Sequence, residues 1–217
     1  MRFLRRWIRR LIFACVLLYL CAVSAIAALR VVNPPFTMVH IQRRIESLFS
    51  PGSYQRRYTF VPLRRIDPHL QHAVIAAEDT RFFDHHGFDW KEVREVIEEG
   101  ESRGASTITQ QLVKNLFFTT RRSAVRKVLE ASLVWPAEWI LGKRRILELY
   151  INVAEWGHGV YGAEAAARHY YNTSAGRIGR ARAARLAAIL PDPRRRKPER
   201  MDSYAATIQA RMRAMGW

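Results

Sequence analysis

Residues 67–78 read DPHLQHAVIAAE, and this stretch decides the fold class. An Asp followed by Pro is a helix start signal. Behind it, apolar residues recur at i, i+3, i+4 and i+7, which is the spacing of one buried helix face: Leu70, Ala73, Val74 and Ala77. We therefore expect a helix that begins near Asp67 and carries Glu78 at the end of its apolar face.

Later segments repeat this helical spacing. Thr107 and Gln110 have the spacing of a capping box, so a second helix should begin at Ser106 or Thr107, with Gly104 allowing a turn before it. A third should begin near Ser123 and break or kink at Pro136. Further helices are predicted over residues 143–153, 163–170 and 180–190. Few segments alternate with period two, so the sequence predicts a mostly α domain without a large sheet.

The N-terminus predicts a membrane anchor. Residues 11–29 contain no charged side chain and, as a helix, would span about 28 Å, close to the thickness of a bilayer core. Five arginines precede this run, and only Arg30 follows it closely, so the positive-inside rule leaves the N-terminus in the cytoplasm. The alternative is a cleaved signal peptide, since Ala25-Ile26-Ala27 is a small-x-small site. Both interpretations export the rest of the chain.

Charge and cysteine content limit the possible binding partners and the ways in which the exported part can be stabilised. A formal net charge of +17 over 217 residues indicates an anionic partner, which could be nucleic acid, lipid head groups or a pyrophosphate. Both cysteines, Cys15 and Cys21, lie in the apolar run, so the exported part must fold without disulfides or cysteine-based zinc sites.

Three clusters could carry chemistry. Residues 77–87 read AEDTRFFDHHG, and a carboxylate at the edge of an apolar face can have its pKa raised toward the range useful for proton transfer. A helix end capped by Gly87 explains this stretch equally well. Thr107, Gln111 and Lys114 share one helical stripe, which could hold sugar hydroxyls and phosphate oxygens or could simply be a solvated face.

The third cluster contains Arg126, Lys127 and Glu130. Arg126 and Glu130 are at i and i+4, so a salt bridge is the default interpretation. In a cleft, the two cations would instead suit a departing pyrophosphate. Residues 157–162, GHGVYG, fit a dinucleotide-binding pattern, but the segment before them looks helical and the expected ribose-binding acid is missing.

Taken in order, these segments resemble the family 51 glycosyltransferases, in particular the monofunctional biosynthetic peptidoglycan transglycosylases. The matching stretches are EDTRFFDHHG (78–87), GASTITQQLVKN (104–115), RKVLE (126–130) and RILELYIN (145–152). The resemblance runs from about Asp67 to Pro193. Two departures are Ala105, where many members have a second glycine, and Arg182, where a glutamate is expected.

The resemblance implies a lysozyme-like helical glycosyltransferase domain with a long groove, preceded by one transmembrane helix. It divides the chain into a cytoplasmic basic segment (1–10), the transmembrane helix (11–30), a linker and membrane-proximal segment (31–66) and the glycosyltransferase domain (67–217). The implied reaction is inverting formation of a β-1,4 link from lipid II, with release of undecaprenyl pyrophosphate. Neither the S-x-x-K nor the K-T-G pattern of a transpeptidase occurs in this chain.

By similarity, Glu78 is the general base and Glu130 is the second carboxylate, near the leaving pyrophosphate. The resemblance assigns the remaining site residues to substrate binding: Asp79, Phe82, His85, Ser106, Thr107, Gln110, Gln111, Lys114, Asn115, Arg126 and Lys127. We expect no tightly bound cofactor and no dedicated metal site, although Mg²⁺ or Mn²⁺ could be shared by Glu130 and the pyrophosphate. Leu116-Phe117-Phe118 could contact lipid or be buried in the core.

The implied setting is the bacterial inner membrane, with a single pass and a periplasmic catalytic domain. Its partners would be lipid II, the growing lipid-linked glycan strand and cell-wall synthesis or division proteins, with no nucleic acid. One rival hypothesis is a lytic, lysozyme-like hydrolase of the same fold. Another is a non-catalytic membrane protein whose basic surface, including residues 194–197, binds nucleic acid or acidic lipid.

Overall fold

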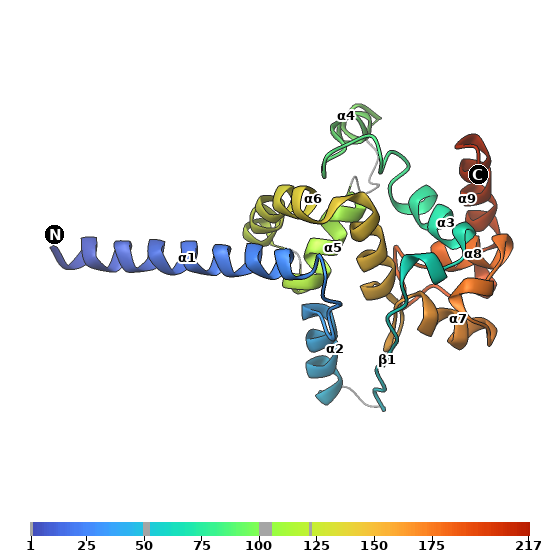
Figure 1. The fold of residues 1–217 in the computed structure, drawn as a ribbon, viewed down its shortest axis with the longest axis horizontal. Coiled ribbons are helices and arrows are strands. Elements are labelled where there is room, and N and C mark those ends of the chain that lie inside the picture. Colours follow the sequence, from blue (N-terminus) through green and yellow to red (C-terminus); the bar gives the residue numbers. More distant parts are fainter. Residues whose placement is uncertain (1, 50–52, 100–105, 122) are drawn as a thin grey trace.

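Helices make up most of the protein, as the sequence predicts. The computed structural model describes residues 2–49, 53–99, 106–121 and 123–217 (Figure 1). Its α-helices are α1 (Arg2–Ala28), α2 (Met38–Leu48), α3 (Pro68–Glu78), α4 (Trp90–Glu99), α5 (Ile108–Phe117), α6 (Ala124–Val153), α7 (Ala163–Tyr171), α8 (Arg180–Ala187) and α9 (Asp202–Ala214). Short 3-10 turns lie at Leu63–Arg65, Ala175–Arg177 and Pro198–Arg200.

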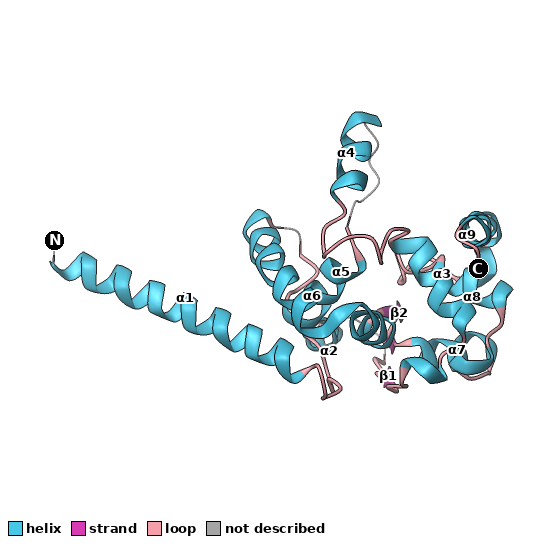
Figure 2. Ribbon diagram, turned by 45° about the horizontal axis from the view of Figure 1, so that its top comes forward, coloured by secondary structure: helices cyan, strands magenta, loops and turns pink. Residues whose placement is uncertain are grey.

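The N-terminal part of the long first helix α1 projects away from the other elements (Figures 1 and 2). The span Phe3–Ala28 is long and apolar enough to cross a membrane: its most apolar 18-residue window has a mean hydropathy of 2.6, and little of that window is buried against the protein. Its last turn joins the domain, because Ile26 is fully buried in the core. Nearer the N-terminus of α1, the Tyr19 hydroxyl donates to the Ser132 carbonyl of α6 at 3.2 Å. The apolar helix therefore lies beside the first half of α6.

Residues 31–66 contain more structure than the sequence predicts. Helix α2 forms in this segment, with the Thr37 side chain accepting a hydrogen bond from the His40 amide as its N-cap. Only Val39 and His40 of α2 are buried. The segment nevertheless carries apolar residues at i, i+3, i+7 and i+10, a spacing that could have predicted the helix: Met38, Ile41, Ile45 and Leu48. The proposed linker residues 50–52 lie outside the described residues.

The core forms where α3 packs against α8 and α9, and where α5 packs against α6. The predicted apolar face of α3 is confirmed for Leu70, Ala73 and Val74, which are fully buried, while Ala77 is half-buried. Asp67 caps α3 by accepting from the His69 amide, as the Asp-Pro start signal indicates. This packing fixes Glu78, the last residue of α3, at the edge of the core.

Helix α6 differs from the prediction at its middle. The helix continues through Pro136, and the non-helical residue is Gly142, with φ 71° and ψ 161°. Glycine has no Cβ, so it adopts this left-handed conformation without strain. The break therefore falls at Gly142, one residue before the separately predicted helix 143–153, and the expected break at Pro136 is wrong.

A small sheet of order β1-β3-β2 contains the glycine-rich stretch (Figure 2). Strand β1 (Arg57–Tyr58) is parallel to β3 (Val160–Tyr161), and β2 (Glu155–Gly157) is antiparallel to β3. A Cβ on Gly159 would lie 2.5 Å from the Gln55 carbonyl oxygen, and one on Gly162 would clash with the Asn152 carbonyl. These glycines allow close backbone packing, which explains the dinucleotide-like pattern without a nucleotide.

Candidate active site

A cleft of about 850 Å³ lies beside the C-terminal end of α3. Elements far apart in the sequence line it: the end of α3 with the segment after it, the start of α4, one face of α5, the segment after α8, and α9. The polar stripe predicted for the second helix faces this cleft, because Thr107, Gln111 and Lys114 all line it. Glu78 lines it as well, so the first two sequence clusters meet in one place.

The two carboxylate oxygens of Glu78 have different surroundings. Its Oε2 accepts a hydrogen bond of 2.6 Å from the Gln111 amide nitrogen, whereas its Oε1 is buried and has no hydrogen-bond partner among the described residues. Burial raises the pKa of Glu78 above its usual range, while the Gln111 hydrogen bond and the positive charges of Lys114 and Arg196 oppose that shift. A desolvated carboxyl with one unused oxygen is suited to accept a proton.

Tyr150 orients the amide that contacts Glu78. Its hydroxyl donates to Gln111 Oε1 at 3.0 Å, which leaves the Gln111 NH₂ group to face Glu78. Tyr150 is buried, and burial raises the pKa of its hydroxyl well above the usual range, so it stays a donor. Tyr150 lies in one of the matching stretches, but no sequence pattern indicates this role.

Lys114 connects the two carboxylates electrostatically. Burial lowers its pKa, and the negative charges of Glu130 and Glu78 partly restore it. Arg126 and Lys127 also act on this ammonium, with the opposite sign to the carboxylates. Lys114 therefore lies within the electrostatic field of Glu78 and of the α6 cluster, which consists of Arg126, Lys127 and Glu130.

Glu130 is buried, at 2% exposed, and is held by two cations of its own helix. Arg126 Nη1 donates to Oε2 and Lys127 Nζ donates to Oε1, each at 2.8 Å. The salt bridge predicted from the i and i+4 spacing is thus confirmed. None of these three residues is among those lining the cleft, so Lys114 is the link between them and Glu78.

Asp79 holds the framework of the site together. Its Oδ1 accepts from His85 Nε2 and its Oδ2 accepts from the Ile108 amide, both at 2.9 Å. Because the Gly87 amide donates to His85 Nδ1, that nitrogen is unprotonated and Nε2 carries the proton. Asp79 therefore ties the segment after α3 to the N-terminus of α5.

The other predicted substrate-binding residues occupy different places. Thr107 and Gln110 form the predicted capping box of α5, and the Thr107 hydroxyl also donates to the Gly87 carbonyl at 2.6 Å. Ser106 lines the cleft. Phe82 is fully buried in the core and Asn115 is half-buried, and neither is among the lining residues. Gly104 and Ala105 lie outside the described residues.

The fit to known proteins agrees with this architecture. A family model described as Transglycosylase matches residues 43–215. The chain belongs to the transglycosylase family. It is 42% identical to the biosynthetic peptidoglycan transglycosylase of Dechloromonas aromatica (strain RCB), over 99% of this chain and 98% of that protein.

Two further relatives carry the same name. The protein of Azoarcus sp. (strain BH72) is 44% identical over 98% of this chain and 97% of its own length. That of Bordetella pertussis (strain Tohama I / ATCC BAA-589 / NCTC 13251) is 50% identical over 72% of this chain and 70% of its own length. The family match begins at residue 43, so it includes most of α2, which the sequence analysis placed in the linker.

A metal ion fits this transglycosylase site poorly. Asp79, His85 and Asp89 lie close enough to form a metal-ligand group. Both nitrogens of His85 are already used, however, by Asp79 and the Gly87 amide, and Asp89 accepts from Arg81 and from the Glu92 amide. Each Glu130 oxygen likewise accepts from a cation. The donor atoms that a divalent cation would use are already engaged.

Several residues that line the transglycosylase cleft escaped the sequence analysis. Arg196 follows α8 and Arg211 belongs to α9, while Arg81 precedes α4 and is bound by Asp89, Glu92 and Glu95. Tyr204 of α9 lies under the Arg196 guanidinium, with 5.5 Å between Arg196 Cζ and the ring centre. For the side of the cleft that carries Arg196 and Arg211, the sequence signal is the basic run 194–197, which the rival hypothesis assigns to lipid or nucleic-acid binding.

Proposed function

We propose that this chain is a peptidoglycan glycosyltransferase that polymerises glycan strands from lipid II and releases undecaprenyl pyrophosphate. The names of its relatives support the peptidoglycan substrate. The observation that carries the proposal is Glu78, a buried carboxyl with an unused oxygen in a cleft that also holds Lys114. A base beside a cation is what glycosyl transfer from a diphosphate requires.

In the proposed reaction, Glu78 takes the proton of the acceptor's 4-hydroxyl as that oxygen attacks the anomeric carbon of the donor sugar. The new C–O bond forms on one face while the bond to the pyrophosphate breaks on the other, and the bonding electrons leave with the pyrophosphate. Inverting hydrolases separate their two carboxyl groups so that a water fits between them. Here the sugar hydroxyl replaces the water, and the product is a β-1,4 link.

The leaving group would be stabilised by the cations around Glu130. Negative charge grows on the pyrophosphate as the bond breaks, and fixed cations lower the energy of that state. Lys114 lines the cleft, and Arg126 is half-buried beside Glu130. Glu130 holds Arg126 and Lys127 in place by hydrogen bonds of 2.8 Å. We assign it a positioning role toward those two cations.

Membrane anchoring suits a lipid-linked substrate, because a tether confines enzyme and substrate to one surface. Beside α1, the first half of α6 exposes large apolar side chains: Val125, Val128, Leu129, Trp135 and Trp139. Helix α2 exposes Ile41, Ile45 and Leu48. We propose that both faces meet the outer surface of the inner membrane, with the N-terminus cytoplasmic and the catalytic domain periplasmic. Phe117 and Phe118 instead pack against the core.

The proposal includes no tightly bound cofactor and no transpeptidase step. Arg126, Lys127 and Lys114 supply the positive charge that a divalent cation would otherwise provide, so no step requires Mg²⁺ or Mn²⁺. The transpeptidase patterns do not occur in the sequence, so crosslinking would fall to other cell-wall synthesis or division proteins.

A lytic hydrolase of related fold is the main alternative, and one assay separates the two. The purified full-length protein would be incubated in detergent with lipid-linked disaccharide-peptide, and in parallel with finished peptidoglycan. Our proposal predicts longer glycan strands from the first substrate and no fragments from the second. Release of soluble fragments from finished wall, without polymer from the lipid-linked substrate, would overturn it.

A further inference from the structure

Two arginines on one wall of the cleft have no acidic partner within ion-pair distance among the described residues. Arg196 donates to the Ala188 carbonyl at 3.0 Å, and Arg211 donates to the Ala76 carbonyl at 3.2 Å. Both side chains are half-buried and line the cleft. Each guanidinium has five N–H donors, so these single bonds leave most of the donors available to a ligand.

Two other half-buried arginines of this protein are paired with carboxylates. Arg81, on the same cleft, pairs with Asp89, Glu92 and Glu95. Arg43 pairs with Glu46 and Glu155. A partly desolvated cation is costly when it stays unpaired. An anion that enters the cleft would therefore stabilise the wall formed by Arg196 and Arg211.

The position of this wall limits what the anion can be. Helix α9, which carries Arg211, lies at the opposite end of the protein from α1 (Figures 1 and 2). The α6 cluster of Arg126 and Lys127 lies instead on the helix that contacts α1. A lipid pyrophosphate is held near the membrane and so belongs at the α6 end. An anion bound at the α9 end must therefore belong to a group that is attached to the sugar and lies away from the lipid.

We propose that Arg196 and Arg211 bind a carboxylate of the peptide that the disaccharide carries, so that the cleft recognises an acidic peptide as well as a pyrophosphate. This inference rests on the proposed function. A carboxylate matches the planar fork of a guanidinium and accepts two parallel hydrogen bonds from it. Tyr204, under the Arg196 guanidinium, keeps that plane in place.

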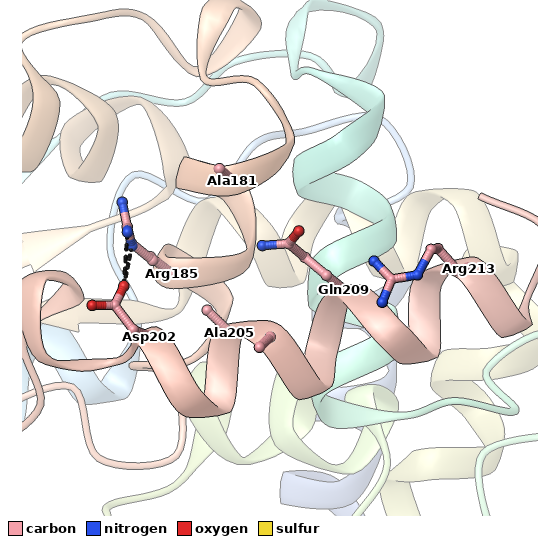
Figure 3. A pocket seen from close by; sticks show the side chains of 7 residues that line it. Ala181, Arg185, Asp202, Ala205, Gln209 and Arg213 are labelled. Carbon is pink, nitrogen blue, oxygen red and sulfur yellow. Dashed lines mark hydrogen bonds and ion pairs between the residues drawn. The ribbon is translucent and has the colours of Figure 1, made fainter.

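The test compares two lipid-linked substrates that share the same pyrophosphate. One carries the free peptide carboxylates, and in the other these carboxylates are converted to amides. The kcat and KM of polymerisation would be measured for the wild type, Arg211→Gln and Arg196→Gln. Arg213→Gln is the matched control, because Arg213 lies on the same helix but lines the separate groove of about 210 Å³ between α8 and α9 (Figure 3).

For the wild type, we expect KM to be about 10-fold higher with the amidated substrate, since a charge-assisted bidentate contact is lost. Arg211→Gln should raise KM for the carboxylate substrate by a similar factor and leave KM for the amidated one unchanged. Arg196→Gln should remove the same discrimination, and Arg213→Gln should retain it. The inference is overturned if the wild type uses both substrates equally, or if Arg211→Gln weakens both equally. A wild type that polymerises neither substrate would instead refute the proposed function.

Discussion

Replacing Gln111 with leucine should raise the pKa of Glu78 further and make the enzyme need a higher pH. The Gln111 amide donates to Glu78 Oε2 at 2.6 Å and is the largest influence that lowers the pKa of this carboxyl against its burial. A hydrogen bond to a charged group contributes about 1.5–3 kcal/mol. Losing that stabilisation of the ionised form shifts the pKa of Glu78 further upward.

The direction in which the pH profile moves follows from the role of a general base, which works only when it is ionised. A higher pKa moves the acid limb of the profile of kcat/KM against pH toward higher pH, while activity above the new pKa is retained. Gln110→Leu is the control, because the neighbouring Gln110 amide caps α5 and makes no contact with Glu78. It should lower stability by about 1 kcal/mol and leave the acid limb in place. An acid limb unmoved in Gln111→Leu would refute the assignment of Glu78 as the base.

Two further predictions concern the framework and the metal. Asp79→Asn should lower the free energy of unfolding by about 1–3 kcal/mol, because one of two buried donors, His85 Nε2 or the Ile108 amide, would meet an NH₂ group; a urea denaturation curve that matches wild type would contradict this. Polymerisation should continue in excess EDTA, because both Glu130 oxygens are bound by cations; activity lost in EDTA and restored by Mg²⁺ would show that a metal takes part.

Much of the helical framework could be predicted from sequence, because periodicity and capping are local. The capping box at Thr107 and Gln110 forms as expected, and the helix predicted to begin near Ser123 does so. Helices α2 and α9 both carried a signal that was overlooked. In α2, Met38, Ile41 and Ile45 recur at i, i+3 and i+7. In α9, the buried residues Ala205, Ile208 and Met212 recur at the same spacing. That spacing could have predicted both helices.

The site was predictable only in part, because its geometry depends on contacts between distant segments. The stripe of Thr107, Gln111 and Lys114 needed one helix alone, and the structure places it on the cleft. The contact of Tyr150 with Gln111 joins residues 39 positions apart, and no local pattern indicates it. Arg196 and Arg211 reach the cleft only because α8 and α9 pack against α3.

The departure at Arg182 has a local explanation. Its guanidinium lies over the ring of Tyr171, with 5.3 Å between Cζ and the ring centre. A cation above an aromatic face is a favourable packing contact. The change from the expected glutamate therefore affects the packing of α8 against the end of α7 and lies outside the cleft.

In the proposed mechanism, Glu78 removes the proton from the attacking sugar hydroxyl. The most direct measurement is the rate of glycan polymerisation from lipid-linked disaccharide-peptide by Glu78→Gln beside the wild type. The variant is nearly isosteric, and its thermal unfolding should show that the fold is retained. Our account predicts a loss of about 10²- to 10⁴-fold in kcat. Full polymerising activity in a folded Glu78→Gln protein would contradict it.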